Sequence, residues 1–306
     1  MNRRFRLIVI YPLLTVSMIL WAYSYLWAKD ALVYYNPITL ICIRTFISAV
    51  FILPVLFILK KQISIKRKHL PALVLLAFFE PFLYFIGETS GLNKVDPAST
   101  AVIISTIPLF TPLAAFYFLK EKVTAWNIAG IVLSLIGIAV MVLDHQLNIQ
   151  ISVEGLLFLT LAVVAAIGYS VVIKRLPGNY SVFTIIFYQN AIGAILFIPL
   201  VFIFDFQQLL ITGWITSAVW PIVKLGVFAS TIAFLFYMYA LKFMDITKVN
   251  IFTNMIPVFT ILIMWIVMDE APEFRKAIGM AVVIVGVFVS QISLGKIRKS
   301  DTPAKH

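Results

Sequence analysis

Blocks of about twenty apolar residues recur along almost the whole chain. A helix rises about 1.5 Å per residue, so a block of this length can cross the roughly 30 Å hydrocarbon core of a bilayer. Hydrophobic residues make up 62% of the sequence and charged residues 12%, whereas a soluble domain is about half apolar and a quarter charged. A transmembrane β-barrel would instead show alternating segments of about ten residues. The sequence therefore predicts an all-α integral membrane protein with many spans.

Ten transmembrane helices are expected, joined by short connections and followed by a cytoplasmic tail, 294–306. The candidate spans are residues 8–28, 37–59, 70–91, 97–119, 124–143, 154–173, 181–204, 219–241, 246–268 and 272–293. The apolar run near the N-terminus lacks a small-residue cleavage site, so we interpret it as an uncleaved first span.

The distribution of basic residues predicts the orientation of these spans. With the N-terminus in the cytoplasm, alternate connections carry 18 Lys and Arg residues on the inner side and 4 on the outer side. This bias places both termini in the cytoplasm. The net charge of +11 then faces anionic lipid heads. The bilayer is the expected partner and nucleic acid is not, while a homodimer is left open.

Several kinds of chemistry lack the residues they need. The single cysteine, Cys42, cannot form an intramolecular disulfide or a cysteine metal cluster. The three histidines (His69, His145 and His306) fall in expected loops or at the terminus, so no zinc motif is visible. There is also no P-loop. We expect no metal site, no cofactor and no direct use of ATP by this chain.

The two halves of the chain share a sequence pattern. IPLFTPLAAFYFLKE (107–121) and IPVFTILIMWIVMDE (256–270) are identical at 6 of 15 positions, at an offset of 149 residues. Gly130 and Gly137 match Gly279 and Gly286 at that offset, and such small residues predict close helix packing. Five spans per half would leave the second half inverted in the membrane. Inverted repeats are typical of alternating-access transporters, so we predict two five-helix repeats, 8–143 and 154–293.

The third predicted span contains EPFLYFIGE, whose two carboxylates are unusual in an apolar run. Glu80 would lie near the bilayer midplane and Glu88 about 12 Å further out. Tyr84 stands between them at i+4 spacing, so the three side chains would form a polar ladder on one side of the helix. Pro81 removes a backbone donor and would leave the carbonyl of Ala77 available.

Arg44 is expected in the second span, at a depth between the two glutamates. A charge at this depth is costly unless it is paired or hydrated, so we expect an ion pair with Glu80 or Glu88. That pair either locks two spans together or takes part in handling a substrate or a proton. Glu80 is the functional candidate by default because it is a midplane carboxylate, whereas Glu88 lies nearer the interface and is open to a solvated role.

Pro108 and Pro257 lie at the centres of the fourth and ninth predicted spans. Each would free the backbone carbonyl four residues before it. Weakened helices at matching places in two halves indicate a midplane binding site. Polar residues flank both breaks, and we select Ser105, Asn250 and Asn254 as candidates for ligand contact. The alternative is a pair of packing kinks in which Ser and Thr bond to their own backbone.

Other intramembrane polar and aromatic residues have two interpretations. The alternating aromatic residues near the outer end of the first span (Trp21, Tyr23, Tyr25 and Trp27) form either an interfacial belt or a substrate cage. Gln189 in the seventh span either contacts the site or bridges helices.

Together these features resemble the EamA-type branch of the drug/metabolite transporter superfamily. The resemblance rests on AST…IPLFTPLAAFYFLKEK (98–122), its echo VNIFTNMIPVFTILIMWIVMDE (249–270), the Trp21…Lys29 pattern and Arg44, and it covers residues 8–293. It implies a basket of two inverted five-helix bundles around a cavity lined by spans 1, 3, 4, 6, 8 and 9. It also implies that Tyr23, Tyr169 and Tyr237 line that cavity. Members export amino acids, metabolites or drugs across the bacterial inner membrane.

We therefore predict a secondary transporter, not an enzyme, that moves a small amino acid-like, amphipathic or cationic compound by alternating access, in the direction of efflux. Glu80 would bind a substrate ammonium group or carry a proton. An uncoupled importer or facilitator is the alternative within transport. A membrane-embedded enzyme would need clustered Asp, His or Cys, or a nucleophile with its base, and here Asp is expected only in loops. A scaffold would not need matched midplane breaks.

Overall fold

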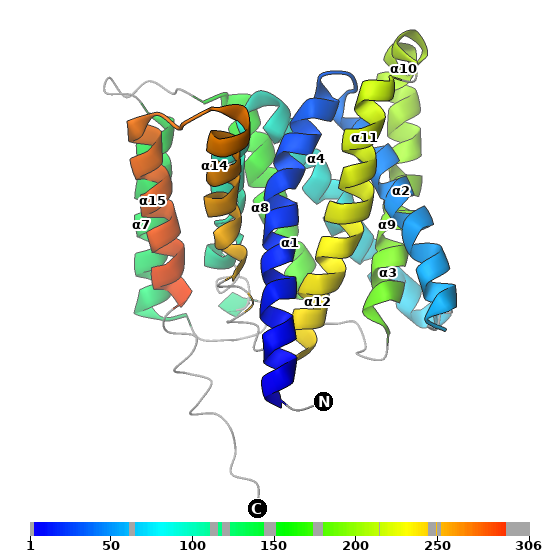
Figure 1. Ribbon diagram of the computed structural model, residues 1–306, viewed down its shortest axis with the longest axis horizontal. Coiled ribbons are helices and arrows are strands. Elements are labelled where there is room, and N and C mark those ends of the chain that lie inside the picture. Colours follow the sequence, from blue (N-terminus) through cyan, green and yellow to red (C-terminus); the bar gives the residue numbers. More distant parts are fainter. Residues whose placement is uncertain are drawn as a thin grey trace, which may run out of the picture.

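The computed structural model is a bundle of helices that run roughly parallel to one another (Figure 1). The structure describes residues 3–60, 65–110, 116–117, 123–143, 151–173, 180–213, 215–243, 249 and 252–291. Within these ranges every regular element is helical, as the apolar blocks predict. The beginning of α1 (Arg3–Leu32) and the end of α15 (Phe274–Gln291) lie at the same edge of the bundle (Figure 1).

Among the described residues, helices follow one another in both halves of the chain. After α1, the first half contains α2 (Pro37–Ile58), a short 3-10 turn η1 (Arg67–His69), α3 (Leu70–Ala77), a π-helical segment η2 (Phe78–Leu83), α4 (Tyr84–Lys94), α5 (Pro97–Ile104) and α7 (Ala125–Val142). Before α15, the second half contains α8 (Val153–Ile173), α9 (Val182–Leu200), η3 (Val201–Asp205), α10 (Phe206–Thr212), α11 (Thr216–Lys224), η4 (Leu225–Ala233), α12 (Phe234–Phe243) and α14 (Met255–Met268).

Seven helices in the described ranges are long and apolar enough to cross a membrane. They are Val9–Leu32, Pro37–Ile58, Arg67–Lys94, Ala125–Val142, Val153–Ile173, Val182–Thr212 and Thr216–Ala240. Each coincides with a predicted span. The predicted spans 97–119 and 246–268 correspond to shorter apolar helices, Pro97–Phe110 and Met255–Met268, and parts of both spans fall outside the described residues. The predicted last span coincides with α15.

Local capping contacts fix where several helices begin. The Asp96 carboxylate accepts a hydrogen bond from the backbone N–H of Ser99 at 2.8 Å, which starts α5. Thr124 and Asn127 form a reciprocal capping box at the start of α7. These contacts satisfy backbone N–H groups that have no partner inside the helix.

Asp205 caps a helix that lies far from it in the sequence. Its carboxylate accepts hydrogen bonds from the Thr39 backbone N–H at 3.0 Å, the Thr39 hydroxyl at 2.7 Å and the Asn36 amide at 3.0 Å. Asp205 is only 4% exposed. The prediction that Asp occurs only in loops is therefore wrong for this residue, because the helix that begins as α9 continues through η3 into α10. The contacts give Asp205 a structural role at the start of α2.

The matched glycines hold α7 and α15 in close contact. These two helices lie side by side at one edge of the bundle (Figure 1). A Cβ atom on Gly130 would lie 2.5 Å from the Gly286 backbone oxygen, and one on Gly279 would lie 2.8 Å from the Gly137 backbone oxygen. The Ser134 hydroxyl also donates to the Val283 carbonyl at 3.1 Å. The prediction that these small residues serve packing is confirmed.

Candidate functional site

The third span is interrupted at Glu80. α3 ends at Ala77, the backbone of Glu80 is extended (φ −145°, ψ 118°), and the peptide bond between Glu80 and Pro81 is cis. The side-chain amide of Gln189 donates a hydrogen bond to the Glu80 backbone oxygen at 3.1 Å. The predicted weakness at Pro81 is confirmed, but the carbonyl that receives a side chain is that of Glu80 rather than that of Ala77. Gln189 therefore bridges two helices at this break.

Two glycines on neighbouring helices make room for the interrupted segment. A side chain at Gly193 of α9 would collide with the ring of Pro81, and one at Gly168 of α8 would collide with the ring of Phe79. The break is therefore seated directly against the backbones of α8 and α9.

Arg44 and Glu88 form an ion pair in the interior of the bundle. The Arg44 Nη1 atom lies 3.8 Å from the Glu88 Oε2 atom, and the two side chains are 5% and 13% exposed. The Arg44 Nε atom donates to the Ser230 hydroxyl at 3.1 Å, and the guanidinium carbon lies 3.9 Å from the centre of the Phe85 ring. The Tyr84 hydroxyl donates to the Glu88 Oε1 atom at 2.8 Å. Both charges are therefore held by several contacts at once.

Tyr25, one of the alternating aromatic residues of the first span, is also a member of this cluster. It is 4% exposed, and its hydroxyl interacts with the Glu88 carboxylate. Tyr23, which the resemblance places in the cavity, instead stacks on Trp27 with ring centres 5.7 Å apart. Two residues turn a helix by about 200°, so the two tyrosines face different ways. We define the Glu88 network as Tyr25, Arg44, Tyr84, Phe85, Glu88 and Ser230.

Only part of the predicted polar ladder is continuous. Tyr84 and Glu88 meet at i+4 spacing as predicted, because both lie in α4. Glu80 precedes the break, so it does not continue the helical face that carries the other two. Of the two partners that the sequence left open for Arg44, Glu88 is the one within ion-pair distance.

The Glu80 side chain lies in a different environment from that of Glu88. Among the described residues, no ion pair or hydrogen bond involves its carboxylate. The hydroxyls of Tyr169 in α8 and Tyr237 in α12 lie close enough to interact with it electrostatically. Tyr237 also lies against Trp21, with ring centres 5.2 Å apart. A half-buried carboxylate thus lies near tyrosine hydroxyls from two different elements, α8 and α12.

The fourth and ninth predicted spans are interrupted at equivalent positions. α5 ends at Ile104, and a turn at residues 105–106 precedes the helical residues 107–110. α14 begins at Met255 after a turn at Asn254. The first turn position, Ser105, and Asn254 are 149 residues apart, which is the offset of the repeated motifs. Both helices are therefore broken as the two prolines predict, just before Pro108 and Pro257.

The polar groups at these two breaks are partly used by the backbone. The hydroxyl of Ser105 donates to the Val102 carbonyl at 2.7 Å, as in the packing alternative. Asn254 is 1% exposed, and α5 and α14 pack against each other. No described hydrogen bond or ion pair joins Ser105, Pro108, Asn254 or Pro257 to Glu80. Asn250 lies outside the described residues.

Lys29 ties the end of α1 to the end of α4. Its ammonium group donates to the backbone oxygen of Leu92 at 2.9 Å and to that of Val95 at 3.3 Å. A lysine in this place satisfies carbonyls that lack helical partners and complements the negative end of the helix dipole. Lys29, which belongs to the Trp21…Lys29 pattern, is therefore a cap on the helix that carries Glu88.

Comparison with known protein families identifies the family of this chain. The model of the EamA-like transporter family matches the chain twice, at residues 9–143 and 153–291. The chain belongs to the EamA-like transporter family. The resemblance drawn from the sequence motifs is thereby confirmed, and the protein is a multi-pass membrane transporter of this family.

Relatives of this EamA family member come from bacteria and archaea. "Uncharacterized transporter YoaV" of Bacillus subtilis (strain 168) is 25% identical over 295 residues, which cover 94% of this chain and 98% of the relative. An "Uncharacterized transporter" of Archaeoglobus fulgidus is 26% identical, over 90% of this chain and 96% of the relative. A "Probable terminal-alkyne amino-acid exporter" of Streptantibioticus cattleyicolor is 23% identical, over 78% of this chain and 80% of the relative. These names indicate transport rather than catalysis.

A solved structure shares the fold. One crystal structure matches this EamA family member with a TM-score of 0.66 and 18% sequence identity, over 96% of this chain and 99% of the other. This likeness concerns the helical architecture alone.

Proposed function

We propose that this EamA family member is a secondary transporter that exports a small cationic or amino acid-like compound, and that Glu80 binds the substrate ammonium group or a proton. One observation carries the proposal. Glu80 is the glutamate of EPFLYFIGE whose carboxylate makes no ion pair or hydrogen bond among the described residues, whereas Glu88, eight residues later, is held by Arg44 and Tyr84. Arg44 and Glu88 act on the Glu80 carboxylate only through longer-range electrostatics.

The surroundings of Glu80 suit a cation that also has an apolar part. An unpaired carboxylate inside a membrane protein is costly, and such groups mark substrate and proton pathways. Tyr169 and Tyr237 lie near Glu80, and Trp21 packs against Tyr237. Aromatic faces attract ammonium groups. A carboxylate with aromatic neighbours thus offers a charge partner and an apolar surface to the same ligand.

The proposed architecture is ten transmembrane helices in two inverted five-helix repeats, 8–143 and 154–293. The family model matches the chain twice over almost the same ranges, and the breaks at Ser105 and Asn254 share the repeat offset. The start of α1 and the end of α15 lie at the same end of the bundle, as an even number of spans requires (Figure 1). The excess of basic residues on that side supports cytoplasmic termini in the cell membrane.

Export is the proposed direction. Its support is the relative named as a probable amino-acid exporter. The alternative is an uncoupled importer or facilitator, which would carry substrate down its own gradient without a proton. Proteoliposomes separate the two, because only a proton-coupled carrier would concentrate substrate when a pH gradient is imposed.

The first test is ligand-dependent thermal stability of the purified protein. We would screen amino acids, polyamines, nucleosides and cationic dyes against the wild type, Glu80→Gln and Glu88→Gln. A ligand at about 100 times its Kd stabilises the folded state by about 2.7 kcal/mol. We expect a cationic compound to raise the melting temperature of the wild type and of Glu88→Gln, and to have no effect on Glu80→Gln.

The two glutamine variants serve as controls for each other because they remove the same charge from the same span. Glu88→Gln is expected to melt at a lower temperature without ligand, since Arg44 loses its partner. A compound that stabilises the wild type and Glu80→Gln equally would show that Glu80 is outside the binding site.

A further inference from the structure

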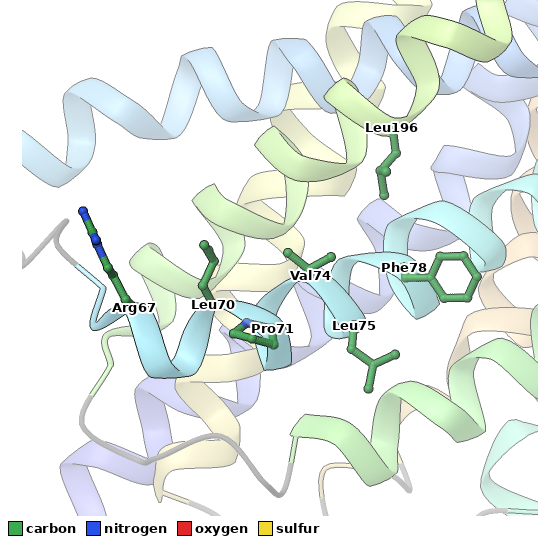
Figure 2. Close-up of a pocket in the computed structure, with 7 residues that line it drawn as sticks. All are labelled: Arg67, Leu70, Pro71, Val74, Leu75, Phe78 and Leu196. Atoms are coloured by element: carbon green, nitrogen blue, oxygen red, sulfur yellow. The ribbon is translucent and has the colours of Figure 1, made fainter.

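An apolar groove runs along the outside of α3. Its volume is about 530 Å³, within the range of about 300–1,000 Å³ that is common for ligand sites. The residues that line it are Arg67, Leu70, Pro71, Val74, Leu75, Phe78 and Leu196. Figure 2 shows that Arg67 lies at one end, that the α3 residues follow one another toward Phe78, and that Leu196 reaches toward them from α9. The groove is thus lined by apolar side chains along α3 and has a basic residue, Arg67, at one end.

The groove lies on the surface that the bundle presents to the membrane. Val74 and Leu75 are 42% and 44% exposed and Phe78 is 40% exposed, whereas Leu73 and Leu76 of the same helix are fully buried. The buried pair packs with Ile185 of α9 in one apolar cluster. The lining side chains therefore face away from the Glu88 network, toward the acyl chains of the bilayer.

The basic end of the groove is held in place. The hydroxyl of Tyr180 lies 2.7 Å from the Nδ1 atom of His69 and accepts a hydrogen bond from the backbone N–H of Lys66 at 3.2 Å. These contacts fix the η1 turn, which carries Arg67 and Lys68, against the start of α9. Neither the segment 65–79 nor the segment 180–204 contains Asp or Glu, so the positive charge at this end is not balanced by an acidic residue of either segment.

We propose that this groove binds a phospholipid with an anionic headgroup, with the headgroup at Arg67 and an acyl chain along α3 as far as Phe78. Lipid tails are as apolar as leucine, so the acyl chain gains little over bulk lipid and the headgroup provides the selection. Basic sites at the ends of transmembrane helices recognise anionic headgroups in this way. The proposal does not depend on what Glu80 binds.

Bound lipid would also contact the segment that carries Glu80. Phe78 is the first residue of η2, two residues before the extended Glu80, and it forms the end of the groove away from Arg67 (Figure 2). An acyl chain packed against Phe78 would favour the observed arrangement of the break. The lipid would therefore stabilise this conformation of the third span, rather than act only as solvent.

The test compares phosphatidylglycerol with phosphatidylcholine of identical acyl chains, added to the purified full-length protein in detergent. We expect phosphatidylglycerol to raise the melting temperature more than phosphatidylcholine does. Arg67→Gln should raise the half-saturating phosphatidylglycerol concentration about fivefold, which corresponds to the roughly 1 kcal/mol that one basic residue contributes near an anionic surface. Lys68→Gln is the matched control, because it removes the same charge from the same turn but does not line the groove.

A second pair of variants tests the apolar part of the groove. Val74→Trp fills the groove at an exposed position and should abolish the phosphatidylglycerol preference while the protein without lipid melts near the wild-type temperature. Val132→Trp adds the same side chain at an exposed position of α7 and should leave the preference intact. The proposal is overturned if Arg67→Gln and Lys68→Gln weaken the preference equally, or if Val74→Trp retains it.

Discussion

At the residue scale, the two glutamates of EPFLYFIGE occupy contrasting environments although they are only eight positions apart in the sequence. Glu88 is balanced by Arg44 and by the Tyr84 hydroxyl, in a cluster whose members come from α1, α2, α4 and η4. Glu80 lies at a chain break beside tyrosine hydroxyls. A paired charge stabilises one arrangement of helices, whereas an unpaired one remains available to a ligand. Glu88 therefore helps to hold the helices around the site together, whereas Glu80 is the residue proposed to bind the substrate or a proton.

Removing Arg44 should destabilise the protein more than removing the whole pair. Arg44→Gln leaves Glu88 buried without its partner, and breaking a buried pair in this way costs about 3–5 kcal/mol. The double variant Arg44→Gln/Glu88→Gln leaves no unpaired charge and should recover much of that loss. Melting temperatures of the purified variants check this order. A double variant whose loss of stability equals the sum of the losses in Arg44→Gln and Glu88→Gln would show that the pair contributes no coupling.

Tyr25 and Tyr23 offer a comparison between two neighbouring hydroxyls. Tyr25→Phe removes a hydroxyl that interacts with the Glu88 carboxylate and should cost about 1.5–3 kcal/mol, the usual contribution of a hydrogen bond to a charged group. Tyr23→Phe should change stability little, since its ring stacks on Trp27 and keeps that contact. Chemical denaturation in detergent measures both. A larger loss in Tyr23→Phe would contradict the assignment of Tyr25 to the network.

The sequence predicted the charged members of the site but not all of its hydroxyls. Arg44, Glu80 and Glu88 are conspicuous because a charge inside an apolar span needs a reason. Tyr25 and Ser230 could not be selected, because the spans are apolar on every side and periodicity does not say which face turns inward. Tyr23 was expected in the cavity only because the family resemblance implied it. Because Tyr23 and Tyr25 are two residues apart, they lie on nearly opposite faces of the helix.

At the element scale, interruptions and close packing occur together. The third span is broken at Glu80, and neighbouring helices approach it at Gly168 and Gly193. The positions of the prolines predicted that helices would break. They did not predict where the backbone would leave the helix, because this depends on partners such as Gln189 that come from elsewhere in the chain.

A side chain at Gly193 should displace the interrupted segment. Gly193→Val would push against the ring of Pro81, and overpacking of this kind costs about 1–3 kcal/mol. Ala191→Val adds bulk to the same helix two residues away, where the side chain is half-buried rather than buried, and should have a smaller effect. Melting temperatures and ligand-induced shifts of both variants would be compared. A Gly193→Val protein with unchanged stability would mean that the break adapts freely.

At the scale of the whole molecule, length and composition determine most of the architecture. Apolar blocks of sufficient length predicted every one of the seven long membrane-crossing helices among the described residues. The repeated motifs pointed to the family before any fold was known, because they combine proline, threonine and glutamate in one register. The paired helices α7 and α15 were foreseeable only in part, since matched glycines predict a close contact but do not name the partner helix.

Reporter fusions test the proposed orientation of the complete molecule. A fluorescent protein fused after His306 should fluoresce, and alkaline phosphatase at the same position should be inactive, because the proposed C-terminus is cytoplasmic. A phosphatase fused after Glu270 would follow nine spans and should be active on the opposite side. Activity of phosphatase at both positions would contradict an even number of spans with cytoplasmic termini.

The contacts between α1 and α4 have a mechanical consequence. Tyr25 meets Glu88, and one helical turn further along both helices Lys29 holds the carbonyl of Leu92. Two such contacts, one helical turn apart, oppose both sliding and rotation of α1 relative to α4. We therefore expect the Lys29 end of α1 and the Leu92 end of α4 to move as one unit. Under the proposed transport, access to Glu80 from the Lys29 end would therefore require α1 and α4 to move together about the interruption just before Pro81.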